Sequence, residues 1–197
     1  MYYRVRRDDN LTPIWVIMGI NVLIFLLLLF KQNLVYFLGM QPAAVLAMPW
    51  TVITAMFTHA SFWHILANMF TFYFFARFVM GLVGTRFMVI IYLVGGIIGN
   101  IFFILIALIF PDNMYHIVIG ASGAVFALGG TLAVLRPTLR VIAFPIPIPM
   151  PLWVAILIGF VILSIIPGIA WQAHLGGVIC GVIFGLFLRN RARGIIY

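Results

Sequence analysis

The hydrophobic residues of this chain gather into six long segments, and most of the charged residues lie between these segments or near the ends of the sequence. Each segment holds 16 to 24 residues, and a helix that crosses the hydrocarbon core of a membrane needs about 20. The pattern therefore predicts six transmembrane helices. They cover residues 13–31, 60–80, 87–110, 120–135, 151–166 and 170–188.

Two of the connections between these segments are unusual. Residues 32–59 are too apolar for a linker in water, so we expect this segment to lie partly in the outer leaflet of the membrane. In residues 144–151 every second residue is a proline, which favours an extended backbone over a helix. These prolines are Pro145, Pro147, Pro149 and Pro151. We expect this connector to lie at the inner face.

The composition supports a membrane protein of a single domain. Of the 197 residues, 66% are hydrophobic and 7% are charged, whereas an ordinary soluble domain is about half apolar and about a quarter charged. This composition excludes a soluble globular protein. Because the six segments and their connections use the chain length, we expect one membrane domain over residues 1–197.

The formal net charge of +8 predicts the orientation of the helices. With the N-terminus inside, ten arginines fall on the inner side and Lys31 alone falls outside, as expected from the positive-inside rule. The inner residues are Arg4, Arg6, Arg7, Arg77, Arg86, Arg136, Arg140, Arg189, Arg191 and Arg193. Both termini are therefore predicted to be cytoplasmic, in a multi-pass protein of the cell membrane. Since the arginines form no continuous basic face, we expect no nucleic-acid partner.

Four polar residues within the predicted helices lie at one depth. Ser122 precedes Arg136 by 14 residues, His174 precedes Arg189 by 15, and His64 precedes Arg77 by 13. At about 1.5 Å per residue these side chains lie roughly 20–22 Å above the inner arginines. In a core about 30 Å thick, this places them roughly 10 Å below the outer surface. Asn68 follows His64 by one helical turn and shares its face.

These residue types point to peptide hydrolysis by a serine. A neutral histidine can take the proton of a serine hydroxyl and make it a nucleophile. Asparagine, histidine and backbone N–H groups can stabilise the resulting oxyanion. The acids are Asp8, Asp9 and Asp112, and the chain has no glutamate, which excludes a carboxylate pair and a zinc-binding HExxH motif. We therefore predict a Ser122–His174 dyad without an orienting acid, and neither a metal nor a cofactor.

A purely structural interpretation of the same residues stays open. Ser122 lies between small residues that could serve only close packing of helices, and His64, His174 and Asn68 could serve as hydrogen bonds between helices. The glycines of the last segment recur every fourth residue, which predicts a face that packs closely on another helix. The glycines expected to pack in this way are Gly123, Gly177, Gly181 and Gly185. The single Cys180 cannot form an internal disulfide.

At these residues the sequence resembles the rhomboid family of intramembrane serine proteases. The likeness extends over residues 12–188 and rests on an ordered set of short motifs. They read WTVITAMFTH at 50–59, HILANM at 64–69, VGTRF at 83–87, GASG at 120–123 and AHLGGVICG at 173–181. Each motif alone is weak, but the set in this order is specific.

The resemblance implies an all-α bundle of six transmembrane helices and a role for each matching residue. Ser122 corresponds to the nucleophile and His174 to the general base. His64, Asn68 and the backbone N–H of Ser122 correspond to the oxyanion hole. Phe126 stands where family members often have a tyrosine that packs on the base.

The resemblance also implies a gate, and two positions depart from the family pattern. Substrate is expected to enter between the second and fifth helices, near Trp63, Phe160 and Leu163. The Trp-Arg pair of the family reads Trp50-Thr51 here, so the loop lacks that arginine, and the family's glutamate near the end of the second helix is replaced around Met80.

Three functions are compatible with these features. The leading one is a serine endopeptidase that cleaves single-pass or multi-pass membrane proteins within the bilayer, near its outer face. The alternative is a pseudoprotease that binds transmembrane helices without cleaving them; because Ser122 and His174 are both present, an enzyme is favoured. A small transporter is disfavoured, because we find neither an inverted repeat nor charged residues at the membrane midplane.

Overall fold

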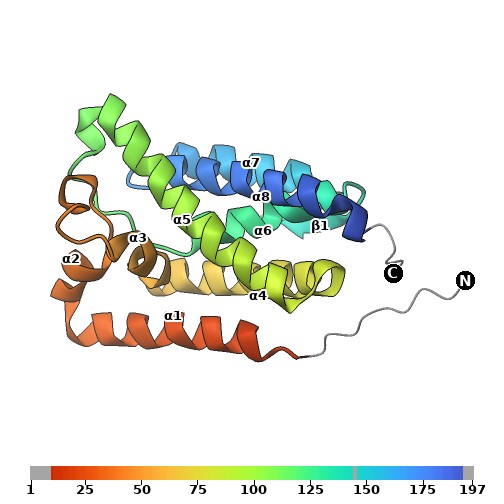
Figure 1. The fold of residues 1–197 in the computed structure, drawn as a ribbon, viewed down its shortest axis with the longest axis horizontal. Coiled ribbons are helices and arrows are strands. Elements are labelled where there is room, and N and C mark those ends of the chain that lie inside the picture. The colour runs from red at the N-terminus through yellow and green to blue at the C-terminus, as the bar shows by residue number, and fades with distance from the viewer. Residues whose placement is uncertain (1–9, 144–145, 193–197) are drawn as a thin grey trace, which may run out of the picture.

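The computed structural model describes residues 10–143 and 146–192, and most of these residues are helical (Figure 1). Six apolar helices lie close to the six predicted segments. They are α1 (Thr12–Phe30), α4 (Phe62–Val83), α5 (Thr85–Ile109), α6 (Ser122–Leu135), α7 (Leu152–Ser164) and α8 (Trp171–Ala192). The predicted inner residues Arg4, Arg6, Arg7 and Arg193, and Pro145 of the connector, lie outside the described residues.

Four of these helices are long and apolar enough to cross a membrane: α1, α4, α5 and α8. The other two, α6 with 14 residues and α7 with 13, are apolar but shorter. The protein is therefore mostly helical and passes the membrane several times. The arginines of the described residues lie in the last two turns of α4, at the start of α5, shortly after α6 and in the last turn of α8, and we call this side of the bundle the arginine-rich end. They are Arg77, Arg86, Arg136, Arg140, Arg189 and Arg191.

The connection between α1 and α4 folds into short helices that are tied together by side chains. It contains α2 (Val35–Leu38), α3 (Thr51–Thr54) and several 3₁₀ turns. The indole N–H of Trp50 donates to the carbonyl of Phe37 at 2.9 Å, and the hydroxyl of Thr54 donates to the carbonyl of Leu38 at 2.6 Å. An isolated bridge between Met40 and Val118 joins this connection to the segment before α6.

The proline-rich connector belongs to a two-stranded antiparallel sheet. Strand β1 (Arg140–Ala143) pairs with β2 (Ile146–Pro151), with Arg140 opposite Pro151. The backbone of residues 146–151 is therefore extended, as the prolines predict. Proline has no N–H to donate, and a strand with only one neighbour tolerates it at alternate positions.

The centre of the bundle is formed by α5, α6 and α8, which approach one another through glycines. A Cβ atom on Gly177 would overlap the carbonyl of Gly123, and one on Gly181 would overlap the carbonyl of Ala127. Close approach of backbones at small residues is the usual way in which membrane helices pack. Thr131, which is fully buried on α6, adds a hydrogen bond of 2.9 Å to the carbonyl of Gly181 on α8.

Candidate active site

Ser122 and His174 are in direct contact. Ser122 is the first residue of α6, and its Oγ lies 2.7 Å from Nε2 of His174 in the first turn of α8. His174 is only 3% exposed. The two residues are 52 positions apart in the sequence, so the contact depends on the packing of α6 against α8. The backbone contact of Gly123 with Gly177, one turn further along α8, brings these two helix ends together.

Gly120 shapes the backbone that leads into Ser122. It has a φ of +121°, a conformation that residues with a side chain rarely adopt. Its N–H donates to the carbonyl of Ala55 at 2.9 Å, which ties this turn to the connection before α4. A Cβ atom at position 120 would lie 2.7 Å from Nε2 of His64 and 3.7 Å from Oγ of Ser122. Because Gly120 has no side chain, a small space stays open there, and Nε2 of His64 and Oγ of Ser122 both border it.

His64 and Asn68 lie one turn apart on α4, next to this space. Nδ2 of Asn68 donates to the carbonyl of His64 at 2.9 Å, within the same helix. An amide carries two N–H groups, so the second one stays available to a ligand. The rings of His64 and His59 meet edge to face, with centroids 4.9 Å apart. Nε2 of His59 accepts the backbone N–H of Ala121 at 3.4 Å, which gives His59 a structural hydrogen bond beside Ser122.

Phe126 packs on the imidazole of His174. The two rings are stacked, with centroids 4.8 Å apart and planes inclined by 29°. Phe126 follows Ser122 by one turn of α6, so its ring reaches the same side of α8. The ring of Phe126 also meets that of Phe160 on α7 edge to face, with centroids 6.5 Å apart. A single side chain of α6 therefore contacts both the histidine of α8 and an aromatic residue of α7.

No acid orients His174 within the described residues. Its Nδ1 is buried and has no hydrogen-bond partner in the part of the chain that the structure describes. The only acid among the described residues is Asp112, in the turn after α5. The described residues also contain no group of three His, Cys, Asp or Glu side chains that could hold a metal ion. The arrangement is a Ser–His pair that can transfer a proton without a third partner.

The three predicted gate residues lie on two helices, Trp63 on α4 and the other two on α7. Trp63, at the start of α4, is 74% exposed, and its ring packs on its neighbour Phe62. Phe160 and Leu163 are half-buried on α7. The aromatic contact that the structure records for Phe160 is with Phe126 and not with Trp63.

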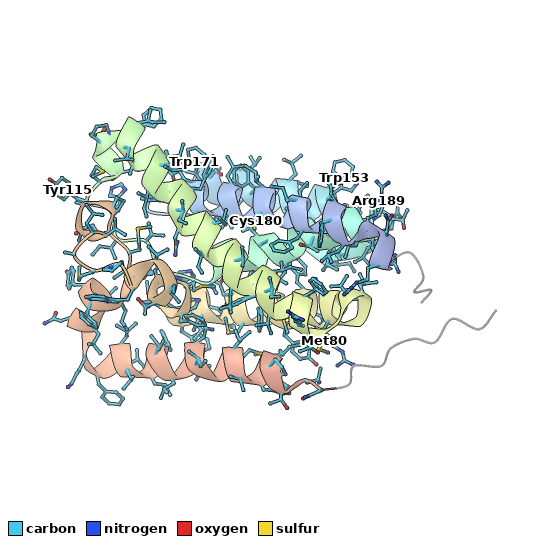
Figure 2. The ribbon with its side chains drawn as sticks, viewed as in Figure 1. Met80, Tyr115, Trp153, Trp171, Cys180 and Arg189 are labelled. Carbon is cyan, nitrogen blue, oxygen red and sulfur yellow. The ribbon has the colours of Figure 1, made fainter. Side chains whose placement is uncertain are left out.

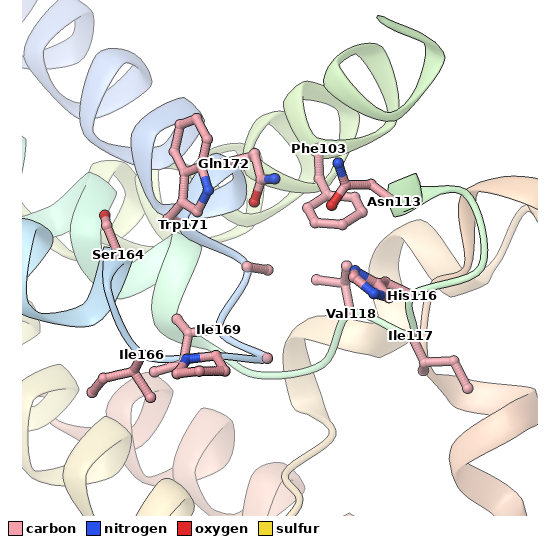
Figure 3. Close-up of a pocket in the computed structure, with 13 residues that line it drawn as sticks. Phe103, Asn113, His116, Ile117, Val118, Ser164, Ile166, Ile169, Trp171 and Gln172 are labelled. Carbon is pink, nitrogen blue, oxygen red and sulfur yellow. The ribbon is translucent and has the colours of Figure 1, made fainter. Parts of the chain in front are cut away.

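A cleft of about 380 Å³ lies between the segment that leads into α6 and the segment that leads into α8 (Figure 3). Figure 3 shows His116 and Val118 on one side and Trp171 and Gln172 on the other. Val118 is two residues from Gly120, and Gln172 is two residues from His174. Gln172 is a buried polar residue that is not among the site residues predicted from the sequence. The only feature of the sequence that could have pointed to Gln172 is its position two residues before His174.

The two departures from the family pattern are accommodated locally. Thr51 is buried, and its hydroxyl donates to the carbonyl of Met48 at 2.6 Å. The connection that lacks the arginine is instead held by the hydrogen bonds of Trp50 and Thr54 described above. Met80 is 4% exposed and packs in the main hydrophobic core.

Comparison with known proteins identifies the family. The model of the rhomboid domain matches residues 46–191, which is most of the chain and includes every residue of the site. The protein belongs to the rhomboid family. The resemblance of its motifs is thereby confirmed.

Two relatives of this rhomboid have names that refer to the family. Rhomboid protein 1, mitochondrial, of Saccharomyces cerevisiae is 28% identical over 147 residues, which are 70% of this chain and 41% of the yeast protein. RHOMBOID-like protein 12, mitochondrial, of Arabidopsis thaliana is 34% identical over 143 residues, 64% of this chain and 43% of the plant protein. The chain therefore spans less than half the length of these relatives.

Proposed function

We propose that this rhomboid is an intramembrane serine endopeptidase that hydrolyses peptide bonds of transmembrane substrates near the outer face. The observation that carries the proposal is the hydrogen bond of 2.7 Å between Ser122 and the buried His174. In this proposal all six apolar helices cross the membrane, with the arginine-rich end inside, and the shorter α6 begins at the depth of the site.

The chemistry needs His174 as a general base. With its proton on Nδ1, His174 accepts the proton of Ser122 at Nε2 while Oγ attacks the carbonyl carbon of the scissile bond. The protonated imidazole then gives this proton to the leaving amine. In the second half of the reaction His174 takes a proton from water, whose oxygen attacks the acyl carbon. The bond to Oγ of Ser122 then breaks, and the imidazolium returns the proton to Oγ. Phe126 holds the imidazole plane in place by stacking on it.

The oxyanion is stabilised by donors from two helices. The backbone N–H of Ser122 belongs to the first turn of α6, where N–H groups have no acceptor within the helix and the helix dipole favours negative charge. His64 lies across the space beside Gly120 and supplies a ring N–H. Asn68 supplies its second amide N–H from the next turn of α4.

Water and substrate reach the dyad by different routes in this proposal. The polar cleft beside Gln172 and His116 admits water from the outer side. The substrate helix enters from the lipid between α4 and α7, near Trp63, Phe160 and Leu163. Both named relatives are mitochondrial by their names and do not support the cell membrane expected from the sequence. The proposal therefore includes membrane-protein substrates but no particular compartment.

Labelling with a fluorophosphonate tests the nucleophile. The chain has only three serines, Ser61, Ser122 and Ser164, so matched variants are available. The purified protein and its Ser164→Ala variant should be labelled equally, and Ser122→Ala should lose the label completely. The hydroxyl of Ser164 bonds to the carbonyl of Phe160 within α7, so this control also probes the nearby helix. Labelling that persists in Ser122→Ala would overturn the assignment.

Cleavage in liposomes separates the protease from the pseudoprotease. A single-pass substrate reconstituted together with the protein should be cut, and the Ser122→Ala variant should bind the same substrate without cutting it. If several single-pass substrates bound but stayed intact with a protein that fluorophosphonate labels, the pseudoprotease would be the better description.

A further inference from the structure

A second, entirely apolar groove of about 370 Å³ lies on the surface between α5 and α8. Residues of these two helices alone line it: Val94, Ile98, Ile179, Cys180, Ile183, Phe184 and Phe187. The stripe of α8 that packs on α6 is the glycine stripe of Gly177 and Gly181. The groove uses a different stripe, in which Ile183 is 61% exposed and Phe187 is 78% exposed.

The groove exists because α5 and α8 separate toward the arginine-rich end. The two helices touch near the start of α8, where a Cβ atom on Gly99 would lie 2.6 Å from the carbonyl of Ala173. Figure 1 shows the ribbons of α5 and α8 crossing there and then diverging. In Figure 2, Cys180 lies beyond this crossing and Arg189 lies at the far end of α8.

Arginines stand at the open end of the groove. On α8 the residues Ile179, Ile183, Phe187 and Arg191 follow one another at four-residue spacing, so they share one face. The guanidinium of Arg191 lies over the ring of Phe87 on α5, 4.8 Å from its centroid. Arg191 therefore connects α8 with α5 at this end of the groove.

Arg191 has no anionic partner in the part of the chain that the structure describes. The single acid there, Asp112, follows the opposite end of α5. Arg86 lies next to Phe87 in sequence, and Arg189 lies two residues before Arg191, so the local charge is strongly positive. A guanidinium at a membrane surface attracts anionic lipid, and its planar N–H groups fit a phosphate.

We propose that this groove binds an anionic phospholipid, with one acyl chain between α5 and α8 and the phosphate at Arg191. Ile179 lies 12 residues before Arg191, or about 18 Å along the helix. Half of a hydrocarbon core is about 15 Å, so the groove matches a lipid of the leaflet at the arginine-rich end. A transmembrane helix in the same groove would cover Phe187 but would bring no phosphate to the guanidinium of Arg191.

Native mass spectrometry of the full chain, titrated with dioleoyl phosphatidylglycerol or dioleoyl phosphatidylcholine, tests the proposal. The anionic lipid should bind about fivefold more tightly, the effect expected of one basic residue near the membrane surface. Arg191→Gln should remove this preference. Arg140→Gln is the matched control, because Arg140 lies on strand β1 at the same end, and it should keep the preference.

Two further variants separate the parts of the site. Ile183→Trp adds bulk to an exposed position of the groove and should weaken the binding of both lipids. Phe87→Leu removes the ring beneath Arg191 but leaves the charge of Arg191 in place, so the preference for phosphatidylglycerol should persist. Fluorophosphonate labelling of Ser122 in each variant reports that the bundle is folded.

Equal binding of the two lipids would overturn the proposal. So would equal losses in Arg191→Gln and Arg140→Gln, which would indicate diffuse attraction to the whole basic end. If the parent protein were a dimer whether or not lipid was added, and Ile183→Trp made it monomeric, a second copy of the chain would occupy the groove instead.

Discussion

The helices α7 and α8 follow each other in the chain and are both apolar, but they are held in the bundle by different contacts. Helix α8 lies against α6 with backbone touching backbone, at Gly177 and Gly181. Helix α7 has only one buried residue, Leu152 at its start, and a Cβ atom added to Gly159 would meet no atom within 4 Å. The first contact resists any displacement, whereas the second consists of side chains that can move aside.

This difference matches the roles proposed for the two helices. His174 must keep its Nε2 within hydrogen-bond distance of Ser122, so the base is best carried by a helix whose backbone is fixed. A substrate helix needs an opening in the bundle, so the gate is best carried by a helix with few buried contacts. Phe126 joins the two regions, because its ring contacts His174 on α8 and Phe160 on α7.

The largest expected effect comes from the base on α8. His174→Ala should lower the turnover of a membrane substrate by about 10²- to 10⁴-fold, the usual contribution of general base catalysis. Cys180→Ala is the matched control, since Cys180 is also buried on α8 but lies six residues beyond His174, away from Ser122. Turnover in reconstituted liposomes measures both. Comparable losses in the two variants would mean that His174 acts only through packing.

The next effect tests whether α4 shares in the chemistry. Asn68→Ala should lower the turnover rate by about 10- to 1000-fold, as the loss of one oxyanion donor does in other serine enzymes. The double variant with His64→Ala should lose more. The rate at which a small fluorophosphonate labels Ser122 in these variants provides a second measurement beside turnover. If the double variant cleaved at the parent rate, the backbone donors of α6 would suffice and α4 would lose its proposed role.

A direct test of the packing difference places the same change in both helices. Gly181→Ala puts a methyl group into the carbonyl of Ala127, and overpacking of this kind costs about 1–3 kcal/mol or more. Gly159→Ala on α7 meets open space, so it should be neutral or should stabilise the helix by up to about 1 kcal/mol. The free energies of unfolding of the two variants, measured in detergent micelles, compare their stabilities. Equal destabilisation would remove the distinction between a fixed α8 and a loosely held α7.

The smallest effect is expected at the gate. Phe160→Ala removes the ring contact between α7 and Phe126, and Leu163→Ala trims the same helix. If opening limits turnover, each variant should cleave a transmembrane substrate a few-fold faster, while fluorophosphonate labels Ser122 at an unchanged rate. Slower labelling in Phe160→Ala would show instead that the ring positions Phe126, and through it His174.

Several features of the site followed from the sequence, because they depend on distance along a helix. The rise of about 1.5 Å per residue was enough to place Ser122, His174 and His64 at one depth, counted from the arginines. The structure brings Oγ of Ser122 to 2.7 Å from Nε2 of His174. The absence of acids from the apolar segments, visible in the sequence, predicts a histidine without an acid partner.

Other features of the site depend on how helices pack across the bundle. The positive φ of Gly120 and the space that its missing side chain leaves for His64 arise only when the turn before α6 meets α4 and Ala55. The hydrogen bond between the backbone N–H of Ala121 and Nε2 of His59, 62 positions apart, likewise depends on this packing.

The sequence by itself determined the class of protein, the positions of its apolar helices and the residues able to do the chemistry, because hydrophobicity, length and residue type act locally. The glycine spacing of α8 also predicts a closely packed face, but only the tertiary structure decided that this face meets the backbone of α6 and that α7 is held by side chains. Apart from these glycines, both helices carry apolar residues on every side over most of their length, so hydrophobicity alone does not distinguish a face that meets lipid from one that meets protein. That distinction is made by the neighbouring helix, whose glycines and carbonyls set how close an approach is possible.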